Sequence, residues 1–342
     1  MRRHESHHHR PSDASTHAEE THGHTHGAID HALFTTQRGM WAVKWSFLGL
    51  AATALLQVLI VGITGSVALL ADTIHNLGDA LTAIPLWIAF RLGQWKPTRR
   101  FTYGYGRVED LAGVVIVGII LLSALITGYL SVQRLLHPQP ISYVGAVIAA
   151  SLIGFVGNEA VAIFRMRIGK EIGSTALIAD GYHARADGLT SLSVLVGAVG
   201  VWLGYALADP IVGLVITAVI LRIVWQSGEA VFTRLLDGID PEVLDEITHA
   251  VHHTQGVCDV SEVRVRWLGH RLHAEVNVAV RADLSVEQGH DIAKEVRHNL
   301  LHELRYLSNA TIHIDPITAS GEVHHAVANH THDEWPPHSH EG

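Results

Sequence analysis

Residues 71–79 read Ala-Asp-Thr-Ile-His-Asn-Leu-Gly-Asp, and residues 179–187 read Ala-Asp-Gly-Tyr-His-Ala-Arg-Ala-Asp. Both stretches fit the pattern A-D-x-x-H-x-x-x-D, and both lie inside long apolar runs. On a helix, positions i, i+3 and i+7 share one face, so each copy places two aspartates and a histidine in one stripe. The two stripes are Asp72, His75 and Asp79, and Asp180, His183 and Asp187.

Two such stripes facing each other would bring two imidazoles and two carboxylates to one point, which is the ligand number of a tetrahedral Zn²⁺ site. A charge at the centre of a membrane helix costs about 2.5–3.5 kcal/mol on insertion scales, so ionisable groups at this depth indicate a polar path or an ion site. The first aspartates of the motifs, Asp72 and Asp180, have two interpretations. They are ordinary polar groups that bond to a neighbour, or carboxylates that fix the tautomers of the histidines. The four expected ligands are His75, Asp79, His183 and Asp187.

The composition is that of a membrane protein. Hydrophobic residues make up 48% of the 342 residues and charged residues only 17%, which is too apolar for a typical soluble protein. The one cysteine, Cys258, excludes an internal disulfide and any metal site with several thiolates. The net charge of −9 argues against a nucleic-acid partner. We expect no signal peptide, because no apolar core precedes Trp41.

Six apolar runs each approach the roughly 20 residues needed to cross a bilayer. They cover residues 42–64, 68–91, 110–132, 141–164, 174–203 and 207–227. The loops between them are short, so consecutive spans are neighbours. The sequence therefore predicts an α-helical membrane domain of six transmembrane helices over residues 41–230.

Basic residues predict the orientation of these helices. They concentrate in the second-to-third and fourth-to-fifth loops, which places these loops, and hence both termini, in the cytoplasm. His75 and His183 then lie in antiparallel helices near the middle or outer half of the membrane, a depth typical of transporter sites. The basic residues of the two loops are Arg91, Lys96, Arg99, Arg100 and Arg107, and Arg165, Arg167 and Lys170.

Residues 238–316 predict a small soluble domain. Helical spacing covers residues 241–254 and 285–304, and strand-like alternation covers 257–267, 271–280 and 310–314. The order αββαβ indicates one layer of helices on one sheet. Residues 1–40 are His-rich and too polar to fold, so we expect a disordered tail, whose histidines are either a weak metal trap or part of a solvated arm. Residues 317–342 are a second polar, His-rich tail.

The whole pattern resembles the cation diffusion facilitator family of zinc efflux proteins. The resemblance covers roughly residues 40–316 and depends on the paired His-x-x-x-Asp motifs in the second and fifth of six spans. The segment 103–109, the ferredoxin-like αββαβ domain and the His-rich tails support it. The family's transport-site ligands fall on His75, Asp79, His183 and Asp187. Two histidines with two aspartates imply zinc, whereas Asp-rich variants imply manganese; Co²⁺, Cd²⁺ and Fe²⁺ stay open.

The resemblance also assigns residues outside the transport site. It pairs Arg107 with Asp237 to tie the membrane part to the cytoplasmic domain at the dimer interface, with Glu109 acting nearby. Anchoring at lipid headgroups is the other interpretation of Arg107. A metal site between the second and third spans is not expected, because Phe101 and Tyr105 replace histidines there.

A cytoplasmic Zn²⁺ cluster falls on His313, Asp315 and His290 by the same resemblance. Ser261 and Asn277 stand where the family has further histidines. Either His270 and His273 substitute for them, or the cluster holds fewer ions. Metal bound in this domain would stabilise the contact between two subunits.

The expected function is Zn²⁺/H⁺ antiport by alternating access, in a homodimer in the cell (inner) membrane. A histidine ligates metal only when neutral, so each site holds metal or protons but not both. A passive metal channel remains an alternative. An intramembrane metalloenzyme is disfavoured because four protein ligands leave no open position on the metal, and the polar stripes disfavour a metal-sensing receptor. In the fourth span, Glu159 beside Asn158 faces the ion path or pairs with Arg165.

Overall fold

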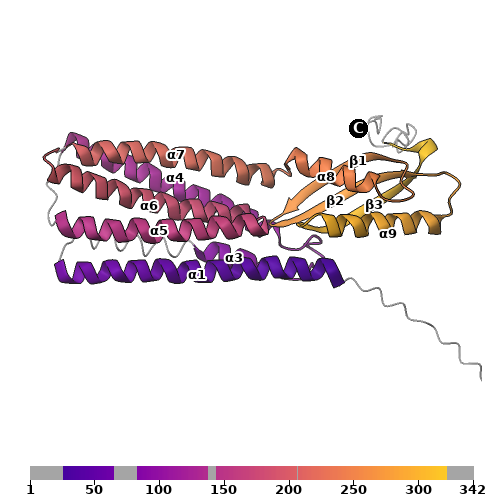
Figure 1. The fold of residues 1–342 in the computed structure, drawn as a ribbon, viewed down its shortest axis with the longest axis horizontal. Coiled ribbons are helices and arrows are strands. Elements are labelled where there is room, and N and C mark those ends of the chain that lie inside the picture. Colours follow the sequence, from indigo (N-terminus) through magenta and orange to yellow (C-terminus); the bar gives the residue numbers. More distant parts are fainter. Residues whose placement is uncertain (1–25, 65–82, 138–143, 206, 322–342) are drawn as a thin grey trace, which may run out of the picture.

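The membrane part of the chain is a bundle of long helices packed side by side (Figure 1). The structure, a computed structural model, describes residues 26–64, 83–137, 144–205 and 207–321. Five helices in these ranges are long and apolar enough to cross a membrane, and a sixth apolar helix is shorter. The helices are α1 (His26–Thr64), α3 (Ala83–Leu92), α4 (Arg107–Leu136), α5 (Val144–Ile172), α6 (Thr175–Trp202) and α7 (Ala208–Leu235). A multi-span helical domain is therefore confirmed, while the second expected span is described only from Ala83 onward.

The helices are longer than the apolar runs that predicted them. Helix α1 begins at His26, so the expectation that residues 26–40 belong to a disordered tail is wrong. Helices α5 and α7 continue to Ile172 and Leu235, past the expected ends at 164 and 227. An apolar run marks the part of a helix that crosses lipid, whereas backbone hydrogen bonds continue into the aqueous phase.

The soluble domain follows the predicted order αββαβ. It comprises α8 (Pro241–His252), β1 (Asp259–Leu268), β2 (Arg271–Val280), α9 (Val286–Glu303) and β3 (Leu307–Pro316), then a short 3-10 helix at Ile317–Ala319. The strand order is β1-β2-β3, with β1 antiparallel and β3 parallel to β2. Asp240 caps α8, and Ser285 forms a capping box with Gln288 at the start of α9.

The sheet has one apolar and one polar face. Alternate residues of β2, beginning with Leu272 and Ala274, are buried in a core shared with the two helices. The intervening positions carry polar side chains, among them Glu275 and Asn277. Helices therefore cover a single face of the sheet, as predicted, and the other face presents polar groups.

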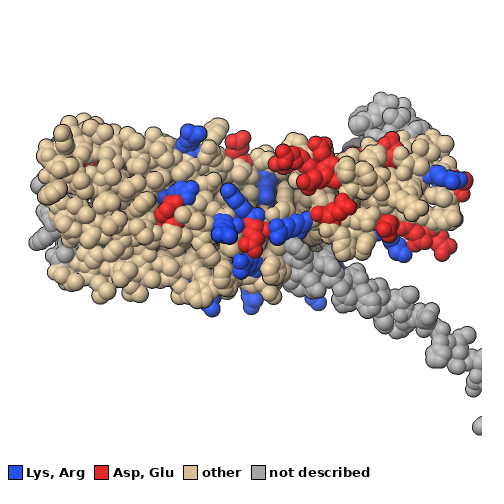
Figure 2. Space-filling view, in the orientation of Figure 1, with Lys and Arg blue, Asp and Glu red and all other residues tan. Residues whose placement is uncertain are grey.

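Charged side chains are unevenly distributed along the molecule. Figure 2 shows an almost uncharged surface over most of the helical bundle and a concentration of both signs where the bundle meets the soluble domain. Because uncharged surface suits lipid and charged surface suits water, this boundary marks the membrane face from which the soluble domain projects.

Candidate functional site

Helix α6 positions the second copy of the repeated motif. Ser174 caps the helix by accepting a hydrogen bond from the Leu177 backbone N–H at 3.1 Å. Two helical turns further on, His183 Nε2 lies 3.8 Å from Asp187 Oδ2, with only 1% and 6% of these side chains exposed. The predicted i, i+4 pairing of this histidine and aspartate is therefore present inside the bundle, out of contact with bulk water.

The first copy of the motif lies outside the described residues. This applies to His75 and Asp79, the other two expected ligands, and to Asp72. In the ranges that the structure describes, no group of three or more His, Cys, Asp or Glu side chains could hold a metal. The four-ligand site therefore stays a prediction, and the structure describes only two of its expected ligands, His183 and Asp187.

Asp180 contacts an arginine rather than the histidine we considered. Its Oδ2 lies 3.1 Å from Arg165 Nη1, and both side chains are completely buried. The same nitrogen donates to the Asp180 backbone carbonyl at 3.3 Å. The interpretation of Asp180 as the carboxylate that fixes the His183 tautomer is replaced by an ion pair between α5 and α6.

A second ion pair joins the same two helices. Arg185 donates to both carboxylate oxygens of Glu159, at 3.2 Å from Nε and 2.5 Å from Nη2. Neither Arg185 nor this pairing was anticipated, and Glu159 does not pair with Arg165. A basic residue two positions after His183 inside an apolar run was the available signal.

The Arg107–Asp237 pair is present at the junction of the two domains. Arg107 forms an ion pair with Asp237 and donates to the backbone carbonyls of Arg234 and Leu235 at 3.2 and 3.0 Å. The guanidinium therefore holds the end of α7 against the start of α4, where the chain leaves the membrane part.

A contact that we did not predict lies beside it. The tip of the β1–β2 hairpin packs on the start of α4, where His270 Nδ1 lies 2.6 Å from Glu109 Oε2, each side chain 5% exposed. The other ring nitrogen of His270 lies 3.0 Å from the Thr36 hydroxyl of α1. A Cβ on Gly106 would lie 2.7 Å from the Leu268 carbonyl oxygen, so glycine is required for this close approach.

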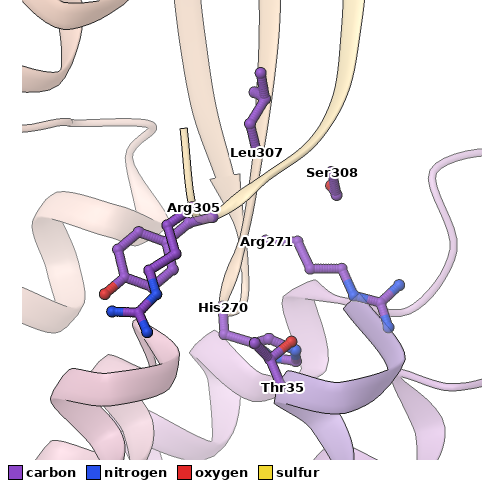
Figure 3. A pocket seen from close by; sticks show the side chains of 7 residues that line it. Thr35, His270, Arg271, Arg305, Leu307 and Ser308 are labelled. Atoms are coloured by element: carbon purple, nitrogen blue, oxygen red, sulfur yellow. The ribbon is translucent and has the colours of Figure 1, made fainter. Parts of the chain in front are cut away.

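A small pocket opens beside the same contact (Figure 3). In this view the His270 ring points toward Thr35, and the Arg271 side chain extends over α1. Burial lowers the pKa of the Arg271 guanidinium, and the nearby Glu109 partly offsets this effect. The pocket is lined by Thr35, His270, Arg271, Arg305, Tyr306, Leu307 and Ser308.

The metal cluster that we expected in the soluble domain is only partly assembled in the residues that the structure describes. His313 Nε2 lies 2.9 Å from Asp315 Oδ1, with the histidine side chain 55% exposed and the aspartate 6%. Asn277 is the strand neighbour of His313 on β2. His290, on α9, does not join them in a three-residue group within the described ranges. His270 cannot substitute, because it is turned toward the membrane helices.

His273, the other possible substitute, lies on the polar face of β2 beside Arg266 of β1 and Asn309 of β3. Burial lowers the pKa of its imidazole, and Arg266 and Arg271 lower it further, while Glu275 acts in the opposite direction. The neutral form, which is the metal-binding form, is therefore favoured.

Comparison with known proteins assigns both domains. Residues 43–236 match the cation efflux transmembrane domain, and residues 239–317 match the cation efflux protein cytoplasmic domain. The chain belongs to the cation diffusion facilitator family. It is a divalent cation efflux transporter and a multi-pass membrane protein.

Of three relatives of the transporter, one has a name that gives a metal, which is manganese. A "probable cation efflux system protein" of Mycobacterium tuberculosis is 54% identical over 296 residues, which cover 86% of this chain and 89% of the relative. The manganese efflux system protein MneP of Bacillus subtilis is 26% identical over 75% of this chain and 89% of the relative. The magnetosome protein MamB of Magnetospira sp. is 24% identical over 75% of this chain and 87% of the relative.

The manganese form of a MamM C-terminal-domain variant is 25% identical, covers 22% of this chain and 96% of that one, and has a TM-score of 0.22.

Proposed function

We propose that this transporter exports Zn²⁺ in exchange for protons, through a tetrahedral site of His75, Asp79, His183 and Asp187. The observation that supports it most is the buried His183–Asp187 pair, 3.8 Å apart on a membrane-length helix. An imidazole beside a carboxylate, out of contact with water, offers one nitrogen and one oxygen ligand to a soft or borderline divalent cation. Two ligands alone bind weakly, so the site needs the matching pair from residues 71–79.

Protons and metal compete for the same histidine in this proposal. Zn²⁺ that enters from the cytoplasm displaces the proton of a charged His183 imidazolium and binds the neutral imidazole that results. After the helices reorient, the histidine takes up a proton from the far side and releases the metal. An ordinary histidine has a pKa of about 6.5, so a modest pH difference across the membrane changes its charge.

The quaternary and cellular context belongs to the same proposal. The transporter works as a homodimer in the cell inner membrane, with both termini in the cytoplasm. The match of residues 239–317 to the family's cytoplasmic domain supports a cytoplasmic location for that domain. The polar face of the sheet, which includes His313 and Asp315, would then bind Zn²⁺ next to the second subunit, with His290 as a further candidate ligand.

Zinc uptake into proteoliposomes under an imposed pH gradient tests the function. The variants His75→Ala and Asp187→Ala are compared with the unmodified chain, and proton counterflow is recorded with a pH-sensitive dye. We expect both variants to lose zinc flux and counterflow together. The proposal is wrong if both variants keep both signals. A zinc flux that is independent of the pH gradient would instead favour a passive channel.

Competition identifies the metal. Uptake of Zn²⁺ is measured with Mn²⁺, Co²⁺, Cd²⁺ or Fe²⁺ in excess. Manganese is the leading rival, because relatives of this chain are named manganese efflux proteins. We expect Cd²⁺ and Co²⁺ to compete better than Mn²⁺, since imidazole ligands suit the softer ions. Stronger inhibition by Mn²⁺ than by Cd²⁺ would overturn the assignment to zinc.

A further inference from the structure

Two ion pairs between α5 and α6 lie on either side of His183 along the helix. Asp180, three residues before His183, pairs with Arg165 of α5. Arg185, two residues after it, pairs with Glu159. Helix α6 begins at Thr175, at the end of the bundle that meets the soluble domain (Figure 1). The Arg165–Asp180 pair therefore lies between His183 and this end of the bundle.

Asp180 and His183 occupy the same face of α6. They are three residues apart, which places them about 4.5 Å apart along the helix axis and on neighbouring positions of one face. A cation that moves along this face from the soluble-domain side reaches Asp180 before His183. The carboxylate is thus positioned as a first oxygen ligand on the way to the transport site.

The two ion pairs differ in how well they are formed. The Glu159–Arg185 pair is bidentate, the strong geometry for arginine and a carboxylate. Arg165 instead presents a single nitrogen to Asp180. Among the described residues, the other guanidinium nitrogens of Arg165 and both carboxylate oxygens of Asp180 make no side-chain hydrogen bond.

Burial makes this incomplete pairing expensive. Both Arg165 and Asp180 are 0% exposed, and a buried ion pair is favourable only where further hydrogen bonds satisfy its remaining polar atoms. The Glu159–Arg185 pair is about 30% exposed, so water can satisfy polar atoms that the pair leaves unbonded. This pair nevertheless has the better geometry. The incomplete geometry of the Arg165–Asp180 pair is therefore not explained by a role in stability. It is explained if this contact must break and re-form.

We propose that Arg165 and Asp180 form the cytoplasmic gate of the transport site, an inference that rests on the proposed function. With the guanidinium on Asp180, the approach to His183 is closed. An entering divalent cation takes the place of Arg165 on the carboxylate, coordinates an Asp180 oxygen, and then passes to His183 and Asp187. The carboxylate always has a cationic partner, either the arginine or the transported ion.

The test separates entry of the ion from binding at the final site. The double variant Arg165→Gln/Asp180→Asn removes both charges at once and leaves no buried ion alone. Zinc uptake into proteoliposomes gives KM and kcat, and calorimetry in detergent gives equilibrium Zn²⁺ binding. We expect KM to rise about tenfold, while equilibrium binding stays within about twofold because the four proposed ligands remain. The matched control, Glu159→Gln/Arg185→Gln, neutralises the other pair on the same helices and should leave KM unchanged.

Further outcomes decide between a gate and a mere structural contact. A double variant with the KM of the unmodified chain overturns the gate, as does an equal rise in KM in the control. If the double variant does not fold, Asp180→Glu replaces it. That variant keeps the carboxylate, and a KM within about threefold of the unmodified chain supports the gate, whereas a tenfold rise contradicts it. Zinc flux with proton counterflow in the unmodified chain, and its loss in His75→Ala and Asp187→Ala, test the proposed function separately from this inference.

Discussion

Two histidine–aspartate pairs of this transporter occupy opposite environments. His183 and Asp187 lie on a membrane helix, 3.8 Å apart and almost without exposure. His313 and Asp315 lie on an edge strand of the soluble domain, 2.9 Å apart, with the histidine 55% exposed. The shorter distance belongs to the pair that water reaches. In the proposed transport site it is exclusion of water, not proximity, that sets the pair apart, because low exposure strengthens each electrostatic interaction with a bound ion.

A third pair, which is buried but lies outside the proposed transport site, tests whether burial alone gives a large effect. Glu109 and His270 are each 5% exposed, at the junction of the domains. A hydrogen bond to a charged group contributes about 1.5–3 kcal/mol, so Glu109→Gln should lower the free energy of unfolding by about that amount. Chemical denaturation of the full chain in detergent measures it.

The control for this change is Asp291→Asn, at an exposed ion pair with Lys294 on α9. This substitution should lower the free energy of unfolding by less than about 1 kcal/mol. Equal losses in the two variants would show that burial does not set the contribution of such pairs here.

Substitution of the two aspartates tests the comparison directly. Asp187→Asn should lower the kcat/KM of zinc uptake by roughly 100-fold, because even groups behind metal ligands contribute 10–100-fold. Asp315→Asn should change uptake by less than about threefold, since water competes for the exposed partner. Both variants are assayed in the same vesicles, with intact folding checked by thermal unfolding. Similar losses in both would place the two pairs on one functional path.

The smallest expected effect concerns His273 and pH. Its pKa in the folded domain is lowered by burial, by Arg266 and by Arg271, so the unfolded chain binds the proton more tightly than the folded chain. The contribution of this histidine to stability is therefore present above the ordinary pKa of about 6.5 and is lost as the pH falls through the lower folded value.

This pH effect is measured as the change in thermal midpoint of the full chain between about pH 7.5 and 5.5. Over this pH range the thermal midpoint of the His273→Gln variant should decrease less than that of the unmodified chain. The same decrease in both would mean that other histidines account for the pH dependence.

The sequence predicted the features that depend on periodicity. The i, i+4 spacing of His183 and Asp187 predicted their shared helix face, and strict alternation predicted the strands of the soluble domain. It did not predict partners that tertiary packing selects. Arg165 meets Asp180 because α5 continues eight residues beyond its apolar run, which ends at 164, to Ile172. His270 meets Glu109 across 161 positions because the hairpin tip packs on α4, which no local pattern encodes.

The segment between α7 and α8 has a mechanical consequence. Asp237 adopts a φ of 62°, a left-handed backbone that is uncommon outside glycine, and Arg107 holds its side chain. A Cβ on the next residue, Gly238, would lie 2.5 Å from the Thr233 side chain, so the turn folds tightly back on the helix. A connection this short and this constrained leaves little freedom of rotation, so we expect any tilt of α7 to be passed on to the soluble domain.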